Sequence, residues 1–175
     1  MMLRAYALTA DENGRFQEAA ASYEAALLAD PADLEATVNL AVLYWQATAR
    51  GAAGALPQEF LKHAQKRLRE LLGSASERFA DCAELRFWKK YITAADAGEP
   101  LQPSECRQLM QERPDYLEPA FVVFSDSAGE EAEPEAMRLL VDYSAQPTAR
   151  GRYVTSIINA VMQKQRWHAG FAPTA

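Results

Sequence analysis

The stretch that decides the fold runs from residue 14 to residue 44 and reads GRFQEAAASYEAALLADPADLEATVNLAVLY. Its first half places Ala19 and Ala26 two helical turns apart, with Tyr23 between them on the same face. Small side chains at such positions let a neighbouring helix approach closely, and the tyrosine fills the groove beside them. The spacing therefore predicts a helix that packs tightly against a partner along this face.

Turn and boundary residues divide the same stretch into helices. Gly14 suits a turn in the left-handed backbone region, which a glycine adopts without steric cost. Pro31 ends the helix that follows, because proline cannot continue the helical hydrogen-bond ladder. Asp33 is placed to cap the next helix. The sequence thus predicts one helix before Gly14, a second up to Pro31 and a third after Asp33.

These marks resemble the tetratricopeptide repeat (TPR). In that family a small residue, an aromatic residue, a second small residue and a proline mark the second helix of each pair. Here they are Ala19, Tyr23, Ala26 and Pro31, while Leu3, Tyr6, Ala7 and Ala10 match the first helix in part. Leu40, Ala41 and Tyr44 follow Tyr6, Ala7 and Ala10 by the family's period of about 34 residues. The resemblance implies an all-α fold, a short right-handed superhelix of antiparallel helix pairs.

Helical spacing continues through the rest of the chain and predicts about nine helices. We expect a single TPR-like helical repeat domain over residues 1–167 and a flexible tail over residues 168–175. The parts of this domain are recognisable repeats over residues 2–31 and 34–72, degenerate helix pairs over 81–112 and 116–143, and a C-terminal capping helix over 149–166. A terminal helix of this kind covers the last apolar face of a repeat array.

Local signals set the expected boundaries between the later helices. Residues 50–56 are expected to form a flexible link, which is an insertion relative to the family. The segment Gly73–Ser76 is expected to break the helix that follows this link. Asp81–Glu84 and Asp115–Glu118 are expected to cap the helices after them through their carboxylates.

Composition and charge limit the classes of partner. The formal net charge is -6 at pH 7, which disfavours nucleic acids and anionic membranes because both reward clustered cations. No stretch approaches the ~20 apolar residues of a membrane span, and the N-terminus lacks the basic and long apolar regions of a secretion signal. We therefore expect a cytoplasmic protein that neither inserts into a membrane nor binds nucleic acid.

The sequence offers little for catalysis. His63 and His168 have no Cys, Asp or Glu at metal-ligand spacing, and no phosphate-binding loop or nucleophile motif occurs. The acidic run Glu130–Glu135 is best explained as a solvated loop and helix N-terminus, where negative charge is favourable. We expect no enzyme activity, no metal and no cofactor.

The resemblance also implies where a partner would bind. In TPR proteins the first helix of each pair lines a concave groove. The groove positions correspond here to Arg4, Leu8, Glu35, Val38, Asn39, Val42, Trp45, Gln46, Arg86 and Lys89. Trp45 is the preferred anchor, because aromatic side chains contribute much of the energy in such interfaces. The alternative is a core tryptophan under the 50–56 link.

Some TPR proteins hold the C-terminal carboxylate of a peptide with five groove residues. Arg4, Asn39 and Arg86 match three of these in type, whereas Leu8 and Cys82 stand where an Asn and a Lys are required. A full clamp is therefore absent, although Arg and Asn can still hold a carboxylate by charge-assisted hydrogen bonds. The alternative is an ordinary groove in which Asn39 bonds to the backbone across the helix pair.

Three functions are compatible with these patterns. The first is a non-catalytic protein–protein interaction module or scaffold that binds a peptide or helix of a partner in the groove. The second is a small acidic TPR chaperone of a bacterial secretion-type system, which would self-associate and co-purify with one unstable client. The third is a small enzyme with a site in the degenerate C-terminal half, where Arg86, Glu84 and Tyr91 would have to converge with Glu118 in a cavity.

Overall fold

The structure is a computed structural model that describes residues 2–48 and 56–170. These residues form nine α-helices and no strand, as the sequence predicts. In chain order the helices are α1 (Met2–Glu12), α2 (Phe16–Ala29), α3 (Leu34–Thr48), α4 (Gln58–Arg78), α5 (Ala83–Ala97), α6 (Pro103–Glu112), α7 (Pro119–Asp126), α8 (Glu133–Ala145) and α9 (Ala149–Gly170). Each predicted helix therefore has a counterpart among the described residues.

The helices fall into two compact units. Unit 1 comprises Met1–Glu99 with Pro147–Arg150, and unit 2 comprises Pro100–Gln146 with Gly151–Ala175. The boundary lies between α5 and α6, which the sequence analysis places together in a pair over residues 81–112. One continuous repeat domain over residues 1–167 stays a prediction.

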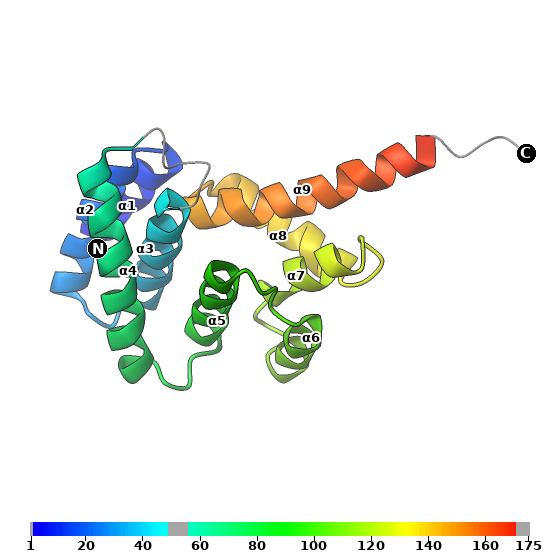
Figure 1. Cartoon of the computed structure of the whole chain (residues 1–175), viewed down its shortest axis with the longest axis horizontal. Coiled ribbons are helices and arrows are strands. Elements are labelled where there is room, and N and C mark those ends of the chain that lie inside the picture. The colour runs from blue at the N-terminus through cyan, green and yellow to red at the C-terminus, as the bar shows by residue number, and fades with distance from the viewer. Residues whose placement is uncertain (1, 49–55, 171–175) are drawn as a thin grey trace, which may run out of the picture. The chain divides into compact units, whose positions relative to one another are not determined.

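Unit 1 is built from adjacent helices that pack in chain order. Helix α1 packs on α2, α2 on α3 and α3 on α4, while α5 packs on both α3 and α4 (Figure 1). The face predicted to nest against a neighbour is buried, since Ala19 and Tyr23 are 0% exposed and Ala26 is 6% exposed. The sequence therefore predicted correctly that α1 and α2 form one packed pair and that α3 and α4 form the next.

The turn and boundary residues near the N-terminus act as predicted. Gly14 has a φ of 69°, in the left-handed region, and it lies between α1 and α2. Helix α2 ends at Ala29, just before Pro31. The backbone N–H of Ala36 donates to Oδ1 of Asp33 at 3.0 Å, so Asp33 caps α3.

A predicted helix break at Gly73–Ser76 is wrong, because α4 runs without interruption to Arg78. The serine hydroxyls form hydrogen bonds to backbone carbonyls of the same helix. Ser76 Oγ donates to the Leu72 carbonyl at 2.6 Å, and Ser74 Oγ donates to the Leu71 carbonyl at 3.2 Å. Ala75 lies between them and is fully buried, so tertiary packing holds this turn in the helix.

Both predicted acidic caps are also wrong. Helix α5 begins after Cys82, which makes no side-chain capping bond, and Glu84 accepts a hydrogen bond from Arg150 instead. Helix α7 begins at Pro119 without a side-chain cap, and Asp115 pairs with Arg113. In each case an arginine takes a carboxylate of the predicted capping segment: Arg150, far along the chain, takes Glu84, and Arg113, two residues away, takes Asp115.

Two predicted flexible segments are only partly described. The link over residues 50–56 lies outside the described residues except for Leu56. Within the predicted tail over 168–175, residues 168–170 continue α9, and residues 171–175 lie outside the described part. Helix α9 is therefore longer than the predicted capping helix over 149–166.

A buried polar cluster joins the first helix pair of unit 1 to the segment Pro147–Arg150. Oδ1 of Asp11 accepts the Ala149 backbone N–H at 2.7 Å, and Oδ2 accepts the Tyr23 hydroxyl at 3.3 Å. Asp11 is 1% exposed. Burial, and next the Asp11 carboxylate, raise the pKa of Tyr23, so its hydroxyl stays protonated and keeps donating. The carboxylate thus satisfies two buried donors from different parts of unit 1.

A second polar cluster in unit 1 links α2, α3 and α4. Oε1 of Glu24 accepts from the Tyr44 hydroxyl and from Nε of Arg67, both at 2.8 Å. Partial burial acts to raise the pKa of Glu24, but hydrogen bonds from Arg67 and Tyr44 outweigh it and hold this pKa below its ordinary value. Glu24 is therefore a carboxylate at neutral pH that stabilises the contact among three helices.

Unit 2 has its own apolar core. Helix α6 packs on α7 and α7 on α8. Fully or nearly fully buried apolar residues include Phe121, Val123, Phe124, Ala136, Leu139, Val154, Ile158 and Val161. Glu118 is 3% exposed at the start of α7 and accepts hydrogen bonds from the Tyr116 and Tyr143 hydroxyls. These bonds satisfy a carboxylate that would otherwise be costly to bury.

Candidate functional site

Four of the predicted groove residues on α3 lie in the interior of unit 1. Val38 and Val42 are 0% exposed, Asn39 is 1% exposed and Trp45 is 8% exposed. The rings of Trp45 and Tyr91 meet edge to face at 5.8 Å between centroids, and Trp45 Nε1 donates to Asp96. The expectation of open groove surface at these positions is therefore corrected, because α5 packs against this face of α3.

The alternative for Asn39, a bond to the backbone across the helix pair, is not made by its side-chain oxygen. Its Oδ1 atom is buried and has no hydrogen-bond partner among the described residues. Arg4 and Glu35 form an ion pair with each other at 3.2 Å, and Arg4 also approaches Asp33 at 3.5 Å. Leu8 and Gln46 are half-buried. Of the residues predicted to hold a carboxylate, Arg4 is thus already ion-paired at the surface, and Asn39 is an amide in the interior.

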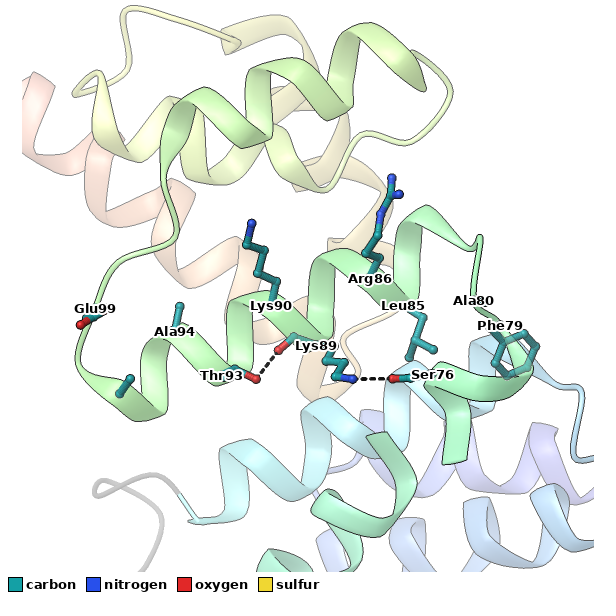
Figure 2. Close-up of a pocket in the computed structure, with 11 residues that line it drawn as sticks. Ser76, Phe79, Ala80, Leu85, Arg86, Lys89, Lys90, Thr93, Ala94 and Glu99 are labelled. Carbon is teal, nitrogen blue, oxygen red and sulfur yellow. Dashed lines mark hydrogen bonds between the residues drawn. The ribbon is translucent and has the colours of Figure 1, made fainter. Parts of the chain in front are cut away.

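The remaining predicted groove residues, Arg86 and Lys89, line a pocket of about 550 Å³ between the end of α4 and one face of α5 (Figure 2). All of the residues around it belong to unit 1. They are Ser76, Phe79, Ala80, Leu85, Arg86, Lys89, Lys90, Thr93, Ala94, Ala97 and Glu99. This volume is in the range of pockets that hold a small molecule or a few residues of a peptide.

Small apolar residues leave the space that forms the pocket. Leu85 is 2% exposed and forms part of its base, and Phe79 is half-buried at the α4 end. Ala94 and Ala97 follow along α5 at helical spacing, so they present methyl groups where larger side chains would fill the volume. These residues make the inner surface largely apolar.

Three cations border this apolar surface along the N-terminal half of α5. Arg86 and Lys90 extend in the same direction from α5, as residues four positions apart do, whereas Lys89 reaches toward α4 (Figure 2). Lys89 Nζ donates to Ser76 Oγ at 2.7 Å, which holds the ammonium group beside the pocket. An ammonium group carries three donors, so this bond leaves donor capacity for a ligand. Glu99 is the acidic lining residue, just beyond the C-terminal end of α5.

The pocket lining holds one acidic side chain. It contains neither His nor Cys, so it lacks a carboxylate pair and a thiol nucleophile. Glu84 bonds to Arg150, Tyr91 packs on Trp45, and Glu118 belongs to unit 2, so these residues do not join Arg86 in the lining. Within residues 2–48 and 56–170, no three His, Cys, Asp or Glu side chains are grouped to hold a metal ion.

Sequence reasoning found two of the pocket's cations and missed the α4 side. Ser76 and Phe79 escaped notice because the break expected at Gly73–Ser76 ended the helix too early. The buried spacing of Leu68, Leu72 and Ala75 was the available signal, because it continues one helix face through the Gly-Ser segment.

Over the described residues, no helix combines the length and apolar character required to cross a membrane.

Comparisons of this chain with family models, curated proteins and solved structures found no match.

Proposed function

We propose that this protein is a non-catalytic interaction module with a TPR-like arrangement of helix pairs, and that it binds a segment of another protein in the pocket between α4 and α5. The observation that carries the proposal is the pocket itself, with apolar walls, a volume of about 550 Å³ and cations at its edge. Packed helix pairs α1/α2 and α3/α4, with small buried residues at the predicted repeat marks, support the TPR-like part.

The location of the pocket differs from the groove that the family resemblance implies. The α3 surface is covered by α5, so binding is assigned to the exposed side of α5 and the last turns of α4. Peptide recognition on helical scaffolds combines apolar side chains placed in a groove with a few polar contacts at its edge. The pocket offers both features.

The experiment is a selection of random peptides on the immobilised full chain, followed by affinity measurements on filled-pocket variants. Ala94→Trp places an indole in the pocket, and Ala97→Trp does so at an exposed position farther along α5. Ala95→Trp is the matched control, because Ala95 is exposed on the same helix and does not line the pocket. Circular dichroism shows whether each variant keeps the helical content of the unmodified chain.

We expect selected peptides to bind the two filled-pocket variants at least tenfold more weakly, about 1.4 kcal/mol, and to bind Ala95→Trp as they bind the unmodified chain. Peptides that bind all four proteins equally would show that the pocket is not the site. Failure to select any peptide would refute the proposed function.

A further inference from the structure

The charges along the pocket are unequal at its two ends. Arg86, Lys89 and Lys90 lie toward the N-terminal half of α5, and Glu99 follows its C-terminal end (Figure 2). Between the cations and Glu99, Ala94 and Ala97 provide the small apolar surface. A ligand therefore meets positive charge at one end, apolar surface next and negative charge last.

The length of this surface indicates the size of the segment that fits. Arg86 and Ala97 are separated by roughly 16 Å along α5, at about 1.5 Å per residue. An extended chain rises about 3.3 Å per residue, so about five residues span that distance. The pocket volume of about 550 Å³ is large enough for a few residues of such a segment, but not for a folded domain.

We propose, on the basis of the proposed function above, that the bound segment is a short extended peptide with carboxylates at one end and an aliphatic or aromatic side chain following them. One carboxylate faces Arg86 and another faces Lys89 on the α4 side of α5, and the apolar side chain packs on Ala94 and Ala97. Guanidinium and ammonium groups bind carboxylates through charge-assisted hydrogen bonds. Glu99 fixes the orientation, because an acidic group at that end is repelled.

The position of the Lys89 ammonium supports this assignment. Its bond to Ser76 Oγ fixes the head group, and Ser76 itself donates to the Leu72 carbonyl at 2.6 Å. A pre-positioned donor loses less side-chain freedom on binding than a mobile lysine does. The Thr93 hydroxyl donates its hydrogen to the Lys89 carbonyl at 2.8 Å, so it does not donate to the ligand carboxylate.

Nucleic acid is the other polyanion that cations can attract, and the surroundings do not favour it. The chain carries a net charge of -6, which repels a polyphosphate backbone outside the pocket. Single-stranded nucleic acids are held by basic grooves that also present aromatic platforms for successive bases. Phe79 is the aromatic residue of this lining, and the rest of its apolar surface comes from Leu85 and alanines.

The test uses the selected peptides and two charge-reversed forms of the full chain. Arg86→Glu changes the pocket, and Arg69→Glu makes the same change of charge at an exposed position of α4 outside the pocket. We expect selection to enrich peptides in which Asp or Glu precedes an apolar residue. We expect Arg86→Glu to lower the affinity for these peptides at least tenfold and Arg69→Glu to change it less than twofold. Replacing the peptide's acidic residue with lysine should restore binding to Arg86→Glu.

Two results separate failure of this inference from failure of the proposed function. If selected peptides depend on Ala94 and Ala97 but show no acidic enrichment, or bind Arg86→Glu unchanged, the pocket is a peptide site and the acidic assignment is overturned. If no peptide depends on Ala94 and Ala97, both are overturned. The third possible result concerns nucleic acid. If a single-stranded oligonucleotide competes with the peptides, and Arg86→Glu lowers its affinity more than it lowers theirs, the acidic-peptide assignment is overturned in favour of nucleic acid.

Discussion

Replacing Asp11 with alanine should destabilise unit 1, because this buried carboxylate accepts hydrogen bonds from two buried donors. The Asp11 carboxylate is 1% exposed and receives the Ala149 backbone N–H at 2.7 Å and the Tyr23 hydroxyl at 3.3 Å. Its removal leaves two buried donors without their acceptor. A buried group that loses its partner retains the full cost of its desolvation.

The expected magnitude follows from these two bonds. Hydrogen bonds to a charged acceptor contribute about 1.5–3 kcal/mol each, and the 3.3 Å bond from Tyr23 belongs at the lower end of that range. We therefore expect Asp11→Ala to lower the free energy of unfolding of unit 1 by about 3 kcal/mol. Tyr23→Phe removes the longer bond alone and should cost about 1.5 kcal/mol.

The assay is urea denaturation followed by tryptophan fluorescence. Trp45 and Trp88 are buried in unit 1, whereas Trp167 is 66% exposed in unit 2. A Trp167→Phe background therefore makes the fluorescence specific to unit 1. Hydrogen exchange of the Ala149 amide gives a second readout, because Asp11→Ala removes its acceptor and should accelerate exchange at that amide.

Asp11→Asn is the matched control. Its amide oxygen can still accept the Ala149 N–H, and the Tyr23 hydroxyl can rotate to accept from the new amide group. We expect Asp11→Asn to lower the free energy of unfolding of unit 1 by less than half as much as Asp11→Ala does. The reasoning is refuted if Asp11→Ala stays within about 0.5 kcal/mol of the unmodified chain and Ala149 exchanges at its original rate.

Three further changes test other parts of the structure. Because the folded-state pKa of Glu24 is lowered, its contribution to stability is complete above the unfolded pKa and is lost as pH falls through the folded one. Glu24→Gln should therefore be less stable than the unmodified chain at pH 7, and thermal melts across pH should show this gap narrowing once pH falls below the ordinary glutamate pKa of about 4.3. Glu118→Ala leaves two tyrosine hydroxyls without their buried acceptor and should destabilise unit 2 by about 2–4 kcal/mol, measured by urea denaturation with Glu118→Gln as the control. Gly129 has a φ of 91°, which strains any residue with a side chain. Gly129→Ala should therefore lower the free energy of unfolding of unit 2 by about 1 kcal/mol or more in the same assay, and an unchanged urea midpoint would show that alanine is not strained there.

The first three helices and the start of α4 were predictable because their signals are local. Small residues at Ala19 and Ala26, the turn glycine at Gly14 and the cap at Asp33 act through neighbours within a few positions. The same logic failed at Gly73–Ser76, because serine hydroxyls satisfied inside a helix look no different in sequence from those that break one. Capping by Glu84 failed because Arg150, far along the chain, takes that carboxylate.

The candidate site was predicted only in part for a related reason. Spacing places Val38, Val42 and Trp45 on one helix, but it does not say whether a later helix covers that face. Helix α5 does so through Tyr91 and Asp96. The pocket then forms on the other side of α5, where its existence depends on how far α4 extends. Such features depend on tertiary packing rather than on local pattern.

Nuclear magnetic resonance of the uniformly 15N-labelled chain, titrated with a selected peptide, tests the central claim most directly. Binding in the pocket predicts amide shift changes centred on Ser76, Leu85, Lys89, Thr93 and Ala94, with the amides of α1 and α2 unchanged. The same titration of Ala94→Trp should leave these amides unchanged at equal peptide concentration. Changes centred on α1 and α2 or on unit 2, with the α5 amides unaffected, would contradict the account.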